Sequence, residues 1–391
     1  MSTDMPISQD DDHDGHITRA KFLAASGSAL AAGLLAACGS SSNASTTTHG
    51  AAASTTSAAT LAKGGSLNIY TWPNYFATKN LSGYKHLTGT TINTSTYDSN
   101  DVLFAKMNSA AGSGFDIVVP SSGWILLMAQ HGMLAKLDHS RIPALHNLDP
   151  ALLNKGYDPG NQYSIPKDYG VEGVVYDPVA VGGTIKTWQD FLDAGEKAGV
   201  SGKVQLSSSG WEVITIPLFA ADGDYNTKDT TKIKAYGDQM KSWAKNVKEF
   251  NGFDITGPVH GTVPLSQCDQ SVGRQCLLQN KKLKWVLPGP TAELWIDNYG
   301  ITAHAPDPNQ AYSFLNYQLQ PKQQVTDTQF IGYPTALAGL RARLPKNLAL
   351  TEMIFGGTNV PLDKLQQFIV DPPILQLYEN LFTEIQAAAG S

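Results

Sequence analysis

The sequence predicts an α/β protein built from two lobes. The chain has 391 residues, more than one ordinary hydrophobic core accommodates. Its 42% hydrophobic and 9% aromatic residues are typical of a globular protein. Stretches rich in β-formers alternate with helical stretches, which favours parallel sheets covered on both faces. The formal net charge is −6 and no basic stripe is present, so nucleic acid is not an expected partner.

The first expected strand covers residues 67–70, after two glycines. Pro73 ends it, because proline donates no hydrogen bond to a neighbouring strand and restricts Trp72 to extended conformations. Trp72 and Tyr75 therefore follow the carboxyl end of this strand. Open α/β sheets bind ligands at that edge, so both rings are candidates for a ligand site. The alternative is that both rings belong to the core.

The other expected elements follow from periodicity, β-branched runs and capping residues. Ser99 or Asn100 is expected to cap one helix, and Ser121 and Ser122 follow a strand and open another, where backbone N–H groups can meet a ligand. The expected strands are residues 90–96, 115–119, 163–166, 173–176, 203–206, 285–287 and 295–301. The expected helices are residues 77–87, 101–111, 121–131, 188–198, 211–221, 230–247, 308–319, 321–328 and 372–388.

The N-terminus is expected to be a targeting segment. Residues 22–37 carry no charge, and this run is too short for a comfortable membrane span. It leads into Leu35-Ala36-Ala37-Cys38-Gly39, which resembles the lipobox of bacterial lipoproteins. Residues 1–37 are thus expected to be a signal peptide and Cys38 the lipidated first residue. The Ser/Thr/Ala-rich residues 38–65 are expected to form a disordered tether. The export route, Sec or twin-arginine, stays open.

Two cysteines follow the expected anchor, Cys268 and Cys276. An even pair in an exported protein indicates a disulfide. A metal pair is the rival interpretation, but no histidine is near enough in sequence to complete a recognisable site. No cofactor and no metal are expected.

From residue 67 to about 388, the chain resembles the spermidine/putrescine-binding proteins of bacterial ABC importers. Seven short segments carry the resemblance, in order along the chain: residues 70–75 (YTWPNY), 95–100 (STYDSN), 115–121 (FDIVVPS), 147–155 (NLDPALLNK), 163–166 (YSIP), 294–297 (LWID) and 331–335 (IGYPT). The resemblance implies a two-lobed periplasmic-binding-protein fold of type II, with two chain crossings between the lobes. It implies residues 66–172 and 297–340 for lobe 1, and residues 174–294 and 344–391 for lobe 2.

The resemblance also implies a ligand site between the lobes. Its implied members are aromatic walls, a wall serine and two carboxylates: Trp72, Tyr75, Ser121, Glu212, Trp295, Asp297 and Tyr333. A polyamine is a chain of ammoniums separated by methylenes. Carboxylates must neutralise the ammoniums, because an unpaired buried charge is prohibitive. Flat rings pack the methylenes and attract the cations.

The chain departs from the family pattern at four positions. Asn74 and Ser209 stand where acids are expected, Ser266 where a tryptophan is expected, and Gly123 where a tyrosine is expected. Two carboxylates remain, which favours a putrescine-sized amine over a longer one. Three further acids are possible substitutes or solvated loop acids: Asp168, Glu172 and Glu293. Lys167 is a candidate for holding an anionic group instead.

The expected function is that of a lipid-anchored substrate-binding protein on the outer face of the bacterial cytoplasmic membrane. It would be a monomer that delivers a linear polyamine to an ABC permease and ATPase complex. Its alternatives are a binding protein of the same fold for an amino acid-like or phosphonate solute, a cleft enzyme using Glu212 and Asp297, or a scaffold lipoprotein without ligand. The sequence contains no Gly-x-Ser-x-Gly elbow, His-Glu-x-x-His helix or Walker loop, so an enzyme is not expected.

Overall fold

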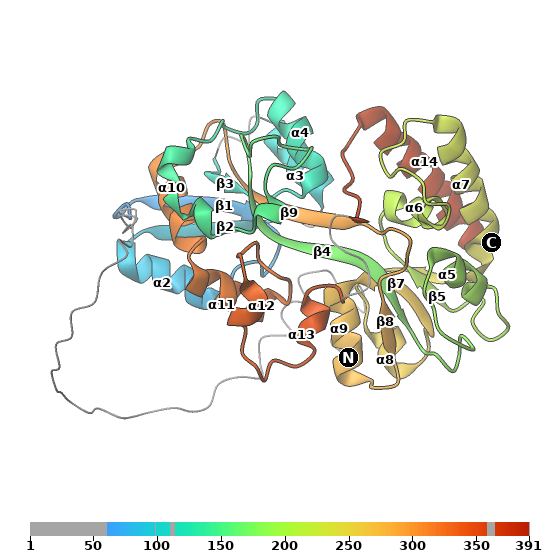
Figure 1. Ribbon diagram of the computed structural model, residues 1–391. Helices are drawn as coiled ribbons and strands as arrows, with labels where there is room; N and C mark the ends of the chain where they lie inside the picture. Colours follow the sequence, from blue (N-terminus) through green and yellow to red (C-terminus); the bar gives the residue numbers. More distant parts are fainter. Residues whose placement is uncertain (1–60, 98, 110–113, 358–363, 391) are drawn as a thin grey trace, which may run out of the picture.

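The computed structural model describes residues 61–97, 99–109, 114–357 and 364–390. The expected signal peptide, the anchor Cys38 and most of the expected tether lie outside these described residues. Figure 1 shows two halves side by side, joined by two long strands that pass between them. This is the expected α/β class with two lobes.

The first half is built on four neighbouring strands. Their order is β2 (Thr91–Thr96), β1 (Ser66–Thr71), β3 (Ile117–Val118) and β9 (Leu294–Ile301). β1 is parallel to β2 and to β3, whereas β3 is antiparallel to β9. The expected all-parallel pairing is therefore wrong here. The helices of this half are α2 (Thr78–Thr88), α3 (Asn100–Met107), α4 (Ser122–Gln130), α10 (Pro308–Gln318) and α11 (Pro321–Ile331).

The strand β4 (Ile165–Tyr176) connects the two halves (Figure 1). Residues 165–171 pair with β9, and residues 172–176 pair with β7 (Leu265–Asp269), both antiparallel. The end of β4 also pairs with β8 (Lys284–Val286). All twelve residues of β4 are buried. The sequence predicted two strands here with a polar loop between them, but the polar residues 167–172 continue one strand.

The second half continues the strand order through β7, β5 (Val204–Leu206) and β6 (Val247–Phe250). β5 is parallel to both of its neighbours. The helices of this half are α5 (Trp188–Gly195), α6 (Gly210–Ala220), α7 (Thr230–Trp243), α8 (Thr256–His260), α9 (Gln270–Gln279) and the long α14 (Pro372–Ala389). Two short helices, α12 (Leu340–Arg343) and α13 (Thr351–Ile354), lie on the return path between the halves (Figure 1).

Local capping explains where several helices begin. The Ser99 hydroxyl accepts a hydrogen bond from the Val102 amide at the start of α3, as the sequence indicated. Thr187 and Asp190 form a capping box at the start of α5. α10 and α11 each begin with a proline, because the first helical turn has no intrahelical partner for an N–H.

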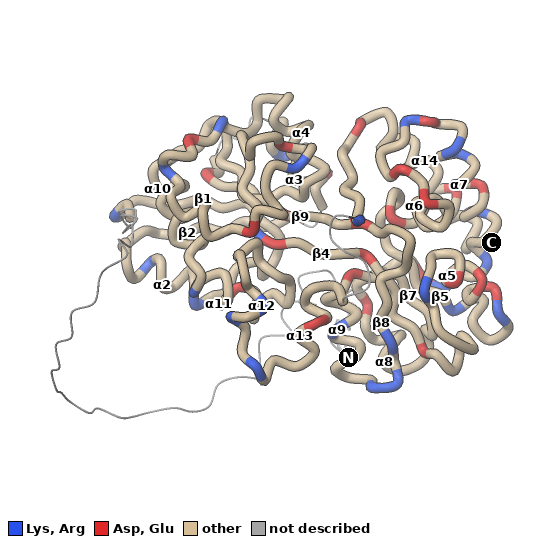
Figure 2. The backbone as a smooth tube through the Cα atoms, in the orientation of Figure 1, with Lys and Arg blue, Asp and Glu red and all other residues tan. Residues whose placement is uncertain are grey.

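The main hydrophobic core runs through both halves as one cluster of buried side chains. Figure 2 shows Lys and Arg scattered over both halves without a continuous stripe, as the composition indicated. No helix among the described residues is long and apolar enough to cross a membrane.

Candidate functional site

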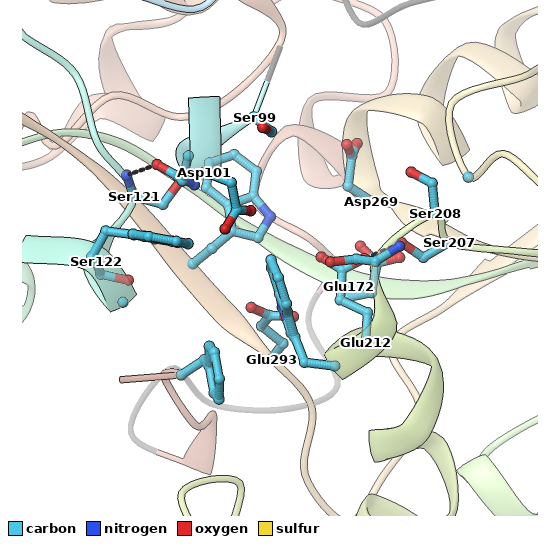
Figure 3. A pocket seen from close by; sticks show the side chains of 18 of the residues that line it. Ser99, Asp101, Ser121, Ser122, Glu172, Ser207, Ser208, Glu212, Asp269 and Glu293 are labelled. Atoms are coloured by element: carbon cyan, nitrogen blue, oxygen red, sulfur yellow. Dashed lines mark hydrogen bonds between the residues drawn. The ribbon is translucent and has the colours of Figure 1, made fainter. Parts of the chain in front are cut away.

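A pocket of about 270 Å³ lies where β1, β3 and the helices of the first half face α6 and β7 of the second half. Figure 3 shows Ser121 and Ser122 on one side of it, and Ser207, Ser208 and Glu212 on the other. Trp72 directly follows β1, and Ser121 precedes α4. The pocket thus lies at the carboxyl ends of the first strands, where the sequence placed a ligand site.

Carboxyl groups dominate the polar lining of the pocket. Its acidic residues are Asp101, Glu172, Glu212, Asp269, Glu293 and Glu379. Among the described residues that line it, there is no Lys or Arg. A carboxylate in a partly buried pocket needs a cation, a proton or several hydrogen-bond donors. The pocket is therefore suited to a ligand with several positive charges.

Aromatic rings form the rest of the wall: Trp72, Trp124, Trp211, Phe253, Trp295 and Phe368. The Trp72 indole donates a 3.1 Å hydrogen bond to the Val119 carbonyl. Trp211 stacks on Phe368 with ring centroids 5.5 Å apart. These contacts fix the orientation of the rings, whose faces attract cations and pack methylenes.

Trp295 lies over the backbone of β4. A Cβ atom added at Gly170 would fall 2.0 Å from Cζ2 of Trp295, so the indole contacts β4 where it has no side chain. The rings of Tyr333 and Trp295 are nearly perpendicular, with ring centroids 4.9 Å apart. The indole thus contacts both β4 and Tyr333.

Glu212 lies in the first turn of α6, where the helix dipole favours a negative charge. The Ser207 hydroxyl donates a hydrogen bond to the Glu212 carboxylate. The side-chain amide of Gln267 donates a 3.0 Å hydrogen bond to the Glu212 carbonyl, which ties α6 to β7. The carboxylate is therefore positioned by both sequence-local and distant contacts.

Glu172 and Asp269 lie directly opposite each other in the antiparallel pair β4–β7. Side chains of such pairs share one face of the sheet at close range. Asp269 also caps α9, accepting 2.8 and 3.0 Å hydrogen bonds from the Ser271 and Val272 amides. The Tyr333 hydroxyl donates a further 2.8 Å bond to it. Two acids thus face the same pocket from neighbouring strands.

Glu293 immediately precedes β9 and is only 6% exposed. Burial is the largest cause that raises the pKa of Glu293 well above its usual value, and the charge of the nearby Glu212 is the second. Toward the opening, burial raises the pKa of Asp101 on α3 and of Glu379 on α14. The charge of Asp101 adds to the rise at Glu379, so acids from the two halves face each other there.

A cluster of hydrogen-bonded polar side chains is buried behind the pocket. Tyr75 Oη is 2.6 Å from Oδ1 of Asp168 and 2.5 Å from Oδ2 of Asp297. The Ser121 hydroxyl donates a 2.6 Å bond to the other oxygen of Asp297. Lys167 Nζ is 2.6 Å from Asp168 and 3.9 Å from the centre of the Tyr75 ring. Lys167 is thus engaged in a buried ion pair, so it is not placed to anchor an anionic ligand in the pocket.

Four of the residues expected at the site line the pocket: Trp72, Ser121, Glu212 and Trp295. The other three are not among its lining residues: Tyr75, Asp297 and Tyr333. Asp297 and Tyr333 each contact residues that do line it, by the hydrogen bonds and ring contact given above, and Tyr75 is linked to the pocket through Asp297. They are 1%, 0% and 0% exposed.

The expectation of solvated loop acids is wrong for three residues: Asp168, Glu172 and Glu293. All three are buried, and the last two line the pocket. The count of two carboxylates at the site is wrong for the same reason. Asp269 was missed, because β7 and α9 were not recognised. An Asp followed by residues that can begin a helix was the available signal.

The expected disulfide is not present. Cys268 on β7 and Cys276 on α9 are both free and buried. The strand β7 and the helix α9 hold the two cysteines in place. Burial raises the pKa of both thiols, which keeps them protonated and unreactive. Among the described residues, no group of His, Cys, Asp and Glu could hold a metal ion.

The fold and the acidic, aromatic pocket between its halves define a solute-binding protein. Residues 81–349 match the family model of the bacterial extracellular solute-binding proteins, and the chain belongs to this family. It is 32% identical over 333 residues to spermidine/putrescine-binding periplasmic protein 1 of Haemophilus influenzae, covering 84% of this chain and 91% of the relative. It is 30% identical over 298 residues to the spermidine/putrescine-binding periplasmic protein of Escherichia coli, covering 74% and 83%.

Solved structures give the same result. The crystal structure of a spermidine/putrescine ABC transporter substrate-binding protein from Streptococcus pneumoniae superimposes with a TM-score of 0.72 at 25% identity. The match covers 83% of this chain and 99% of that one. The two-lobed type II fold expected from the sequence is therefore confirmed.

Proposed function

We propose that the protein captures a linear polyamine of the putrescine and spermidine class between its lobes and delivers it to an ABC importer. The observation that carries this proposal is the pocket lining, which combines six carboxyl groups with six aromatic rings and includes no Lys or Arg among its described residues. An amino acid-like or phosphonate ligand would need a cationic partner for its acid group.

The chemistry of a polyamine fits this lining. Ammonium groups pair with carboxylates, and each hydrogen bond to a charged group contributes roughly 1.5–3 kcal/mol. Indole faces cover the methylenes and attract the cations, at roughly 0.5–2 kcal/mol each. The names of the relatives support the same ligand class, since those of the two relatives named above include both spermidine and putrescine.

The acids of the pocket bear on the length of the ligand. Only two carboxylates were expected, which favoured a putrescine-sized amine. Six line the pocket, so the number of acids no longer disfavours a triamine.

The remaining parts of the proposal concern the cellular setting. We propose lipid anchoring at Cys38, a monomeric protein outside the cytoplasmic membrane, and an ABC permease and ATPase as partners. We propose no catalytic role. The lobes are proposed to divide as residues 66–172 with 297–340, and residues 174–294 with 344–391. The pairing of β4 with β9 on one side and with β7 on the other supports a division near residue 172.

Isothermal titration calorimetry tests the proposal. Putrescine, spermidine, glutamate and an alkylphosphonate are titrated separately into the purified protein. We expect binding of at least one amine and none of the two anionic compounds. Recovery of unchanged amine after incubation separates binding from catalysis. Binding of an anionic compound without any amine would overturn the polyamine proposal.

A further inference from the structure

We propose that Glu293, together with Glu212, forms a binding site for one protonated amine of the ligand. The inference deepens the proposed function and rests on it. It assigns a ligand contact to a residue that the sequence left as either a substitute ligand acid or a solvated loop acid, and it gives the second half of the pocket an ammonium site of its own.

The backbone holds Glu293 in place at the pocket wall. The Glu172 amide donates a 3.4 Å hydrogen bond to the Glu293 carbonyl. On either side of Glu293, the Leu294 amide donates 2.8 Å to the Gln366 carbonyl, and the Gln366 amide donates 3.0 Å to the Ala292 carbonyl. Three chain segments therefore fix this position.

The side chain of Glu293 has capacity for a ligand. It lines the pocket and is 6% exposed, and Figure 3 shows it near Glu212 and Glu172. Among the described residues, none makes a hydrogen bond to its Oε2 atom, which is itself buried. Such an oxygen is costly to bury without a donor. An ammonium has three N–H donors, so it can bond Oε2 and the Glu212 carboxylate together.

The groups that face Glu293 are acids and tyrosines. Glu212 approaches from α6, Glu172 from β4, and Tyr225 from the loop after α6, with Tyr378 of α14 beside Tyr225. The Tyr225 hydroxyl lowers the pKa of Glu293, but its effect is smaller than the increases caused by burial and by Glu212. One hydroxyl can satisfy at most one of the roughly four acceptor positions of a carboxylate. Burial and Glu212 thus favour the protonated form of Glu293 without ligand, and we expect an ammonium to displace that proton.

The amide variant of Glu293 distinguishes a binding role of this side chain from a purely structural one. A carboxyl group that serves only the fold would lower stability when changed to its amide. A ligand contact predicts the opposite pattern for Glu293→Gln. Its unfolding temperature without ligand stays equal or rises, because a buried acid beside another acid is removed. Its affinity for amines falls.

Calorimetry of the full protein with spermidine and with putrescine tests this. Each titration is run in two buffers of different ionisation enthalpy, which reports the protons released on binding. For Glu293→Gln, we expect affinity lower by about tenfold to hundredfold, and proton release lost. Glu196→Gln, an exposed acid at the end of α5, is the matched control and should bind as the unchanged protein does.

The outcomes are distinguishable. If the unchanged protein binds neither amine, the proposed function fails and this inference with it. If it binds an amine but Glu293→Gln binds within about twofold and releases as many protons, only the inference is overturned. If Glu293→Gln does not fold, the release of protons by the unchanged protein on binding tests the inference instead. An absence of proton release from about pH 6 to 9 would then overturn the inference.

Discussion

The hydroxyl of Ser121 donates a 2.6 Å hydrogen bond to Oδ1 of Asp297. Ser121 lines the pocket, whereas Asp297 is fully buried in β9 behind it. Asn100 at the start of α3 donates a 3.0 Å bond to the same hydroxyl. The wall of the pocket is therefore held by a carboxylate that is not among the residues lining it.

We expect Asp297→Asn to weaken binding of spermidine or putrescine by about tenfold to hundredfold. The amide offers only one acceptor oxygen in place of the two that Ser121 and Tyr75 contact, so Ser121 loses its position. Calorimetry measures the affinity, and thermal unfolding measures the accompanying loss of stability. Asp193→Asn, an exposed change on α5, is the control. Unchanged affinity for Asp297→Asn would show that the buried carboxylate does not position the site.

The Trp72 wall gives a second prediction. Trp72→Ala should reduce amine affinity by roughly threefold to thirtyfold, because one cation–π face is lost but no charge loses its partner. The Tyr97 ring and Val119 carbonyl would also lose the indole, so stability falls by about 3–5 kcal/mol. Trp72→Phe should restore most of the affinity. A loss of affinity larger than that of Asp297→Asn would contradict the expectation that losing the ring weakens binding less than losing the carboxylate.

Stability should depend on pH through Asp327, which lies on α11 away from the pocket lining. Burial raises its pKa to about 6. Its folded pKa exceeds the unfolded value of about 3.9, so the folded protein gains stability as pH falls from about 7 to 4.

The amide variant tests this. In Asp327→Asn, the amide oxygen can still accept the bonds that Ala77 and Asn80 now give to Oδ1. We expect a gain of about 1–3 kcal/mol at neutral pH, and a smaller rise in stability on acidification. Chemical denaturation at several pH values measures both. A loss of stability at every pH would mean that the second oxygen of Asp327 is needed as an acceptor.

Lipid anchoring is tested by Cys38→Ala in the producing bacterium. A diacylated cysteine supplies two acyl chains, which is enough for stable membrane attachment. We expect the unchanged protein in the membrane fraction with the mass of the lipid, and the variant in the soluble or secreted fraction. Ser40→Ala is a control that leaves the cysteine in place. A variant that stays with the membrane would argue against the anchor.

Closure of the proposed lobes is tested by small-angle scattering. Because β4 and β9 both pass between the halves, bending at these strands can bring the lobes together. We expect a smaller radius of gyration with a saturating amine than without it. Identical curves with an amine that calorimetry shows to be bound would count against a hinge but not against the fold.

The fold was largely accessible from sequence, because most elements have strong local signals. The helix α2 and the proline-led α10 and α14 were predicted close to their observed bounds. β4 was not, because Lys167, Asp168 and Glu172 read as a solvated loop. Asp168 bonds to Tyr75 and pairs with Asp297 across β4 and β9, and only the folded chain brings these distant segments together.

The site was predicted only in part, because some of its residues have a local sequence signal and others do not. Trp72 and Ser121 were found because they follow apolar strands, a pattern visible locally. Glu293 carries no local sign of its role, and Asp269 carries only that of a residue preceding a helix: each becomes part of the pocket through pairing with a residue more than 70 positions away. The number of acids in the pocket was therefore underestimated.

The contact between Gly170 and Trp295 makes the indole a built-in optical reporter. The ring rests on the backbone of a strand that runs between the halves, so any change in the bend of that strand alters its surroundings. Emission from Trp295 would then follow lobe movement and ligand arrival in one signal. A protein in which the tryptophans outside the pocket are replaced by phenylalanine would sense its solute without an attached dye.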